Sequence, residues 1–497
     1  MELIWNEINA PRLIFGGVEQ TELEGALPPP EGKTVRELID YGAEVFADAC
    51  RVDAGKLTVN GRIVVKLVAA DENGSVFGFT SESAFEHTAE NEAFEKGMLA
   101  EAQITIQDLN VRLTTDERVM LAAVIDIDHR VVSGAPVRVL GGVSGVRDME
   151  IKSREYPIWR KAELGGAAIS IGEEISSDGA EAVLAHSVRV SVRETAFENG
   201  GVTVVGAATV SMLLRGEGGE LSQLVRTLPF RENVQTSGAA DEVYASAEVL
   251  SSSARALGTE FSLVAFDAEI ALTVYAAQKS EVRLPLDAFS PTINFNCIKQ
   301  RAVFLGALGG ANITSSRRET ASVPNGMEDI FSPSAVFVRT VLTGANVANG
   351  EAELTGVLIT RVIYRTGGGR TEVFTEDVPF TLHTAAPETA SSVKARAEAA
   401  ATITGGSSRS VLITYNIDAF AEFYSETALD VVAGLAENTA DTGEAERFGG
   451  LIIHTASDGD EVFDIAKRFR VPSSSVREMN AGCPDVFKEG DKVVLIV

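Results

Sequence analysis

The sequence contains very few of the residues that build metal clusters and disulfide frameworks. Of its 497 residues, 3 are cysteine and 5 are histidine. They are Cys50, Cys297, Cys483, His87, His129, His186, His383 and His454. No two of them stand at the short spacing of a zinc-binding pair, and three scattered cysteines cannot form a disulfide framework. We therefore expect reduced thiols, no metal site and no other cofactor.

Basic charge and long apolar runs are scarce as well. The best candidate for a membrane span, residues 263–277, is interrupted by Asp267 and Glu269, whereas a span needs about 20 predominantly apolar residues. With 71 acidic and 43 basic residues, the formal net charge is −28. Such a charge opposes nucleic-acid binding, which depends on neutralising phosphates. The first residues also lack a basic segment followed by an apolar core. We expect a cytoplasmic protein that neither enters a membrane nor binds nucleic acid.

Motifs typical of enzymes are incomplete. Gly32-Lys33-Thr34 ends like a phosphate-binding loop, but Leu27 stands where the motif requires glycine, and three prolines follow it. Residues 141–145 lack the spacing of a serine-nucleophile elbow. We therefore expect a protein that is not an enzyme and has no catalytic residues. An enzyme with an unrecognised site is the alternative.

The sequence does contain one spacing of three glycines and a phenylalanine that occurs three times. In each copy the later anchors lie 6, 19 and 30 positions after the first. The anchors are Gly55, Gly61, Gly74 and Phe85, then Gly200, Gly206, Gly219 and Phe230, then Gly350, Gly356, Gly369 and Phe380. Self-similarity at a fixed period is typical of tandem copies of one domain.

Each copy shows the alternating, β-branched pattern of strands. In the first copy, residues 56–68 and 75–85 are predicted strands joined by a turn at Asn73-Gly74. The same hairpin is expected in all three copies, with the phenylalanine in the core. Residues 34–39 and 327–331 predict a short helix at the start of a copy. The expected fold is mainly β, with three tandem sandwich-like repeats and a small βααβ domain.

Composition and spacing also predict where the domains begin and end. Residues 433–450 are rich in alanine, glutamate, threonine and glycine, which is typical of a linker. The expected organisation is three β-rich repeats over 1–140, 141–285 and 286–430, a linker over 431–448, and a C-terminal domain over 449–497.

The C-terminal segment predicts a strand, two helices and a second strand. Gly459-Asp460 precedes the first helix, Ile465-Ala466 lies within it, Asn480 ends the second, and Gly490 precedes the last strand. In this order and spacing the segment resembles a LysM domain. It departs from the family at Glu461, where threonine is usual, at Val462, where leucine is usual, and at residues 481–484.

The LysM resemblance implies a shallow groove between the loop before the first helix and the loop after the second. That groove would bind N-acetylglucosamine polymers. By resemblance its lining residues are Asp458, Gly459, Asp460, Glu461, Asn480, Ala481 and Gly482. A role in helix caps or turns is the alternative for each of them.

Three such repeats followed by a LysM domain are similar to the SPOCS-domain spore-coat morphogenetic proteins of endospore-forming bacteria. The terminal Pro229-Phe230 and Pro379-Phe380 pairs, with Ala84-Phe85 in the first copy, contribute to this resemblance. It implies a scaffold on the mother-cell side of the forespore surface. Its LysM domain would bind the coat basement-layer ATPase or another spore-coat protein. A peptidoglycan-binding protein is the alternative.

Overall fold

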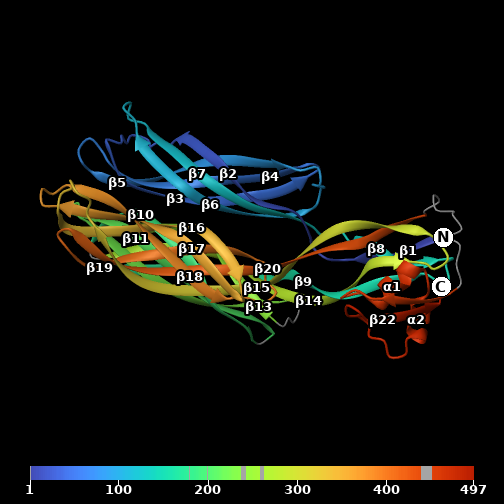
Figure 1. Ribbon diagram of the computed structural model, residues 1–497. Coiled ribbons are helices and arrows are strands. Elements are labelled where there is room, and N and C mark those ends of the chain that lie inside the picture. Colours follow the sequence, from blue (N-terminus) through green and yellow to red (C-terminus); the bar gives the residue numbers. More distant parts are fainter. Residues whose placement is uncertain are drawn as a thin grey trace.

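The computed structural model describes residues 2–177, 179–198, 200–236, 242–257, 262–437 and 450–496. Within these ranges the protein consists mainly of long antiparallel strands in several separate sheets. The prediction of a mainly β fold is confirmed. Figure 1 shows a large elongated body of strands that narrows into a smaller lobe, which contains both helices.

Three units of six strands follow one another along the chain and share one topology. In each unit a first strand is followed by a three-stranded meander, and the last two strands form a hairpin that pairs with the first strand. Unit 1 consists of β2 (Arg12–Ala26), β3 (Glu37–Asp53), β4 (Lys56–Ala70), β5 (Val76–Glu90), β6 (Leu99–Leu113) and β7 (Val119–Ser133). Unit 2 consists of β9 (Glu150–Ser176), β10 (Ala180–Glu198), β11 (Gly201–Gly216), β12 (Leu221–Gln235), β13 (Glu242–Ala256) and β14 (Leu263–Phe289). Unit 3 consists of β15 (Phe295–Ser322), β16 (Ile330–Ala348), β17 (Glu351–Thr366), β18 (Thr371–Ala385), β19 (Ser392–Ser407) and β20 (Ser410–Glu437).

Each unit has its own apolar core between the meander and the other three strands. In unit 1, Leu57 and Ile63 of β4 and Ile125 of β7 are fully buried in one cluster, as the alternation of apolar residues in these strands requires. Units 1 and 3 also share a six-stranded sheet, because Arg12 of β2 pairs with Phe304 of β15.

The repeated glycines have two different structural roles. The first and third of each set lie between strands of the meander with φ from 75° to 83°, a conformation that favours glycine. The middle glycine lies within a strand, directly opposite the phenylalanine of its set; the pairs are Gly61–Phe85, Gly206–Phe230 and Gly356–Phe380. A Cβ atom on Gly356 would lie 2.5 Å from the carbonyl oxygen of Val341 and 2.6 Å from Cζ of Phe380. The phenyl ring therefore covers the glycine, and a side chain at this position would displace it.

The three units meet at corresponding positions. Val68 of β4, Leu213 of β11 and Ile363 of β17 belong to one buried cluster, and each lies seven residues after the middle glycine of its set. The units are therefore arranged around a shared apolar centre, each contributing the same part of its meander.

The smaller lobe is built partly from strands of the units. β1 (Glu2–Ile8) and β8 (Val137–Ser144) form a two-stranded sheet there. β9 and β14 have 27 residues each, β15 and β20 have 28 each, and their ends extend from the units into the lobe (Figure 1). Residues 450–496, which we call the C-terminal module, contain β21 (Leu451–Thr455), α1 (Val462–Phe469), α2 (Ser473–Met479) and β22 (Lys492–Ile496), and β21 pairs antiparallel with β22.

Two sequence-based expectations differ from the structure. The predicted helices at 34–39 and 327–331 are wrong, because β3 begins at Glu37 and β16 at Ile330. Pairing with neighbouring strands there outweighs a helical period of only five or six residues. The predicted boundaries at 140/141, 285/286 and 430/431 fall within β8, β14 and β20, and residues 438–448 of the predicted linker lie outside the described residues.

Candidate functional site

The two loops predicted to form a groove lie side by side in the C-terminal module. The backbone N–H of Gly459 donates to the carbonyl of Phe487 at 3.0 Å, and the N–H of Phe487 donates to the carbonyl of Asp460 at 2.8 Å. Glu461 forms an isolated antiparallel bridge with Val486. Asp458, Gly459, Ala481 and Gly482 are exposed. The structure therefore places residues 458–461 against residues 485–487, with 480–482 in the turn that follows α2.

Several of the predicted groove residues serve the local fold. The amide of Asn480 donates from Nδ2 to the carbonyls of Val476 and Val494 at 2.8 and 2.7 Å, and its Oδ1 accepts from the N–H of Val494 at 2.8 Å. These bonds use both hydrogens and the oxygen of the amide, so the side chain connects α2 to β22. The carboxylate of Asp460 accepts from the N–H of Ser457 at 2.9 Å. Gly459 and Gly482 have φ of 85° and 80°, as turn glycines do.

Glu461 has a role that its position in the sequence does not reveal. Its carboxylate forms ion pairs with Lys152, at 3.1 Å, and with Arg154. Both cations belong to β9, more than 300 residues earlier in the chain. Glu461 thus connects the C-terminal module to unit 2.

A charge-complementary contact extends this connection along α1. The Nζ of Lys152 lies 3.0 Å from the carboxylate of Asp464, and the Nζ of Lys467 lies 2.6 Å from that of Asp287. Lys152 and Asp287 are cross-strand partners in β9 and β14. The strand pair and α1 therefore each present one cation and one anion, and each cation lies against the anion of the other element. We call these four residues, together with Glu461 and Arg154, the docking contact.

The electrostatics of the docking contact favour the ionised side chains. Burial opposes charge on Lys152, but hydrogen bonds and attraction from Asp464 and Glu461 raise the pKa of its ammonium group above the usual value. Burial likewise opposes charge on Asp287, but Lys467 holds the pKa of its carboxyl below the usual range. Phe289 at the end of β14 packs edge-on against Phe463 of α1, with ring centroids 5.0 Å apart. The docking contact therefore combines ion pairs with an aromatic contact.

A second cluster of polar residues lies at a contact among the three units. The carboxylate of Glu422 in β20 accepts from Tyr244 of β13 at 2.7 Å and from Tyr424 at 2.5 Å, and lies 2.8 Å from Nζ of Lys161 in β9. Glu101 of unit 1 lies 3.7 Å from the same ammonium group. Glu422 is only 6% exposed, so its charge depends on these partners. We call the group formed by Glu422, Lys161, Tyr244 and Tyr424 the polar centre.

The polar centre keeps its carboxylate ionised and its phenols protonated. Burial would raise the pKa of Glu422, but attraction and hydrogen bonding by Lys161, with donation from both tyrosines, lower it below the usual value. Burial and the neighbouring carboxylate of Glu422 raise the pKa values of Tyr244 and Tyr424. At neutral pH one carboxylate, one ammonium group and two donating phenols therefore satisfy one another.

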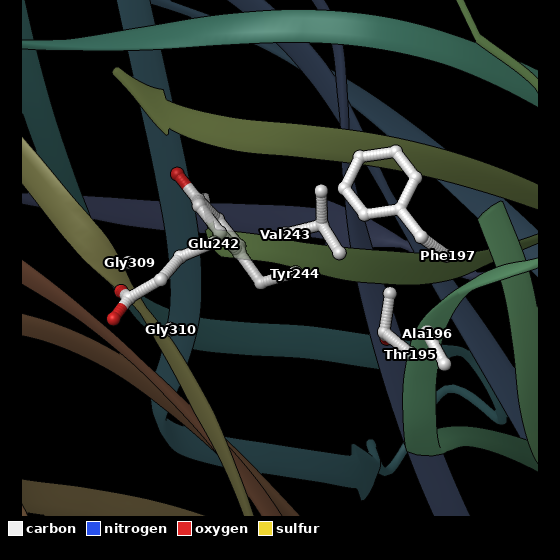
Figure 2. A pocket seen from close by; sticks show the side chains of 8 residues that line it. All are labelled: Thr195, Ala196, Phe197, Glu242, Val243, Tyr244, Gly309 and Gly310. Atoms are coloured by element: carbon white, nitrogen blue, oxygen red, sulfur yellow. The ribbon is translucent and has the colours of Figure 1, made fainter. Parts of the chain in front are cut away.

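An open recess of about 400 Å³ borders the polar centre. It is lined by Thr195, Ala196, Phe197, Glu242, Val243, Tyr244, Gly309 and Gly310. Figure 2 shows the carboxylate of Glu242 reaching toward the two glycines, with Val243 and Phe197 on the other side. The hydroxyl of Tyr244 donates to Glu422, so the hydrogen of this hydroxyl is already used within the protein. Sequence reasoning missed the recess and the polar centre, since their residues come from different units and share no motif.

Neither a metal cluster nor a membrane-spanning helix is present in the part of the chain that the structure describes. Among the described residues, no group of three or more His, Cys, Asp or Glu side chains is arranged to hold a metal ion. No helix in the described ranges is long and apolar enough to span a bilayer. Comparisons with family models, with curated proteins and with solved structures found no match to the chain.

Proposed function

We propose that the chain is a non-enzymatic scaffold of the bacterial endospore coat. Three sandwich-like repeats would form its assembly platform, and a LysM module would bind a coat morphogenetic protein on the mother-cell side of the forespore surface. The motif resemblance to SPOCS-domain proteins supports this proposal. The strand, helix, helix, strand order of the C-terminal module, with its antiparallel strand pair, supports the LysM part.

The docking contact is the observation that carries the proposal. It holds α1 on the first residues of β9 and the last residues of β14, two strands of unit 2, so the module is presented in a defined position at one end of the body. A binding module that is held in place loses less orientational freedom when its partner binds. Such an arrangement suits a scaffold, whose task is to keep partners in fixed relative positions.

The alternative is binding of peptidoglycan through N-acetylglucosamine units. The two adjacent loops, with exposed Asp458 and Ala481, favour it. The amide of Asn480, however, is fully used within the fold, and Glu461 is held by two cations. Sedimentation of the full chain with purified peptidoglycan would support this alternative.

A capture experiment tests the scaffold function. The full chain and a chain ending at Ala440 are used as baits in extracts of sporulating cells. We expect a coat protein, with the basement-layer ATPase as the first candidate, to bind only the full chain and to stay bound after muramidase treatment. Capture of the same proteins by both baits would contradict a partner-binding role of the module.

A further inference from the structure

The C-terminal module has an exposed apolar surface that no predicted groove residue belongs to. Leu451 and Ile453 of β21 are 66% and 61% exposed, and Ile496 of β22 is 58% exposed. Leu451 is directly opposite Ile496, and Ile453 is directly opposite Val494. These four residues form one aliphatic patch on one side of the two-stranded sheet, which we call the outer face. Contiguous apolar patches of this kind mark sites of interaction.

The outer face points away from the contacts that attach the module to the body. The other side of the sheet is buried: Val493 and Leu495 belong to the module's core together with Val462 and Ile465 of α1. The docking contact uses the far side of α1, through Asp464 and Lys467. The helices therefore lie between the sheet and the body, and the outer face is exposed within the described part of the chain.

The dimensions of the outer face fit one helix. A strand of five residues is about 16 Å long, and two strands with their side chains are about as wide as an α-helix. Sixteen ångströms corresponds to about three helical turns. A sheet that buries one face against its own helices can cover the other face with a partner's helix, as in layered α/β packing.

The charge at one end of the outer face indicates which charge a bound helix would carry. Thr455 and Lys492 form the next cross-strand pair after Ile453 and Val494, and Lys492 is exposed. The face thus changes from aliphatic to cationic along its length. An acidic residue at one end of the apolar stripe of a helix would complement it.

We propose that the outer face, and not the loop groove, is the protein-binding surface of the module, and that its ligand is an amphipathic helix with an aliphatic stripe and an acidic end. This inference rests on the proposed scaffold function and names the partner's chemistry. Aliphatic side chains offer no hydrogen-bonding groups to a sugar. A second copy of the chain would bring together two bodies that each carry a formal charge of −28, which opposes their association.

A peptide experiment with the full chain tests the binding surface. The probe is a fluorescent helical peptide of about 14 residues with leucine at every third or fourth position and a glutamate pair at one end. We expect Ile453→Asp to weaken binding more than about tenfold, as loss of a central apolar anchor does. Lys492→Glu should weaken it about twofold to fivefold and should improve binding of a matched peptide with a lysine pair. Asp458→Asn, an exposed change on the groove side and outside the docking contact, should leave the affinity unchanged.

The inference would be overturned by a lack of saturable binding, by equal affinity of Ile453→Asp, or by loss of binding with Asp458→Asn. Thermal unfolding checks that each variant is folded, and Ile453→Thr provides a milder change with an intermediate expected loss. A concentration-dependent dimer that Ile453→Asp abolishes would identify a second copy as the occupant and would also overturn it.

The same variants as baits separate this inference from the scaffold function. If the module-dependent partner is retained by Ile453→Asp and lost with Asp458→Asn, the scaffold function stands and the outer-face inference fails. If the chain ending at Ala440 captures the same partner as the full chain, the scaffold function fails, and the peptide measurement still decides what the outer face binds.

Discussion

The three units and the C-terminal module are attached in different ways. The units meet through buried residues, both aliphatic, as at Leu213, and ionised, as at Glu422. The module is attached through the docking contact, where Lys152, Glu461 and Asp464 remain 17%, 21% and 35% exposed. Ion pairs that retain contact with water contribute less and are weakened by salt. The module's attachment should therefore be more sensitive to salt than the junction between the units.

Removing the carboxylate of the polar centre tests the junction between the units. Glu422→Ala leaves the ammonium group of Lys161 and two phenols without their partner, and loss of one member of a buried ion pair costs about 3–5 kcal/mol. We expect a lower free energy of unfolding by urea denaturation. The double variant Glu422→Leu with Lys161→Met should recover most of the loss, because apolar residues of similar size can replace a buried pair. A loss in Glu422→Ala no greater than that of a surface variant would contradict this account.

A methyl group on the middle glycine tests the core of a single unit. Gly356→Ala places a Cβ within 2.6 Å of the Phe380 ring, and we expect a loss of about 2–4 kcal/mol in unfolding free energy. Gly434→Ala in β20 is the matched control, since its Cβ would meet its nearest neighbour, Ile298, at an ordinary 3.5 Å. Equal stability of the two variants would show that the packing of the Phe380 ring does not require glycine at position 356.

Charge reversal at Lys152 tests the attachment of the module. Lys152→Glu faces two carboxylates, and we expect docking to weaken by about 1–3 kcal/mol, with faster hydrogen exchange in α1 and little change in the units. Combining it with Asp464→Lys should partly restore protection. The exposed Arg51→Glu serves as a control for net charge. If neither the charge reversal nor high salt changes the rate of hydrogen exchange in α1, apolar packing at Phe463 holds the module.

A dependence of stability on pH is expected at the junction of units 1 and 2. Burial and the nearby Lys66 lower the pKa of His186 from 6.5 to about 4. The folded protein therefore binds this proton less readily than the unfolded chain. The contribution of His186 is complete above pH 6.5 and is lost as the pH falls toward about 4. Between these pH values, we expect the melting temperature of His186→Gln to fall less than that of the parent protein. An equal fall in the two proteins would contradict this.

The sequence predicted those features that depend on local pattern. Alternating residues such as those around Ile63 indicated strands, and the glycine spacing indicated hairpins, since turn glycines and strand periodicity act over a few residues. The residues that join the parts have no such signal. Lys152 and Asp464, or Lys161 and Glu422, look like ordinary surface charges, and only the folded chain brings them together across more than 250 positions. The helices expected at the start of two copies failed because pairing with the next strand of the meander, β4 or β17, decided their conformation.

The length of β14 has a mechanical consequence. This strand begins in the core of unit 2 and ends at Phe289, beneath the C-terminal module, and it pairs with β9 along almost its whole length. Hydrogen bonds of an antiparallel pair run across the strands, so a force that moves β14 past β9 loads many of them in shear at once. Such a force would be shared along the paired strands within unit 2, with no single hydrogen bond of the pair bearing it first.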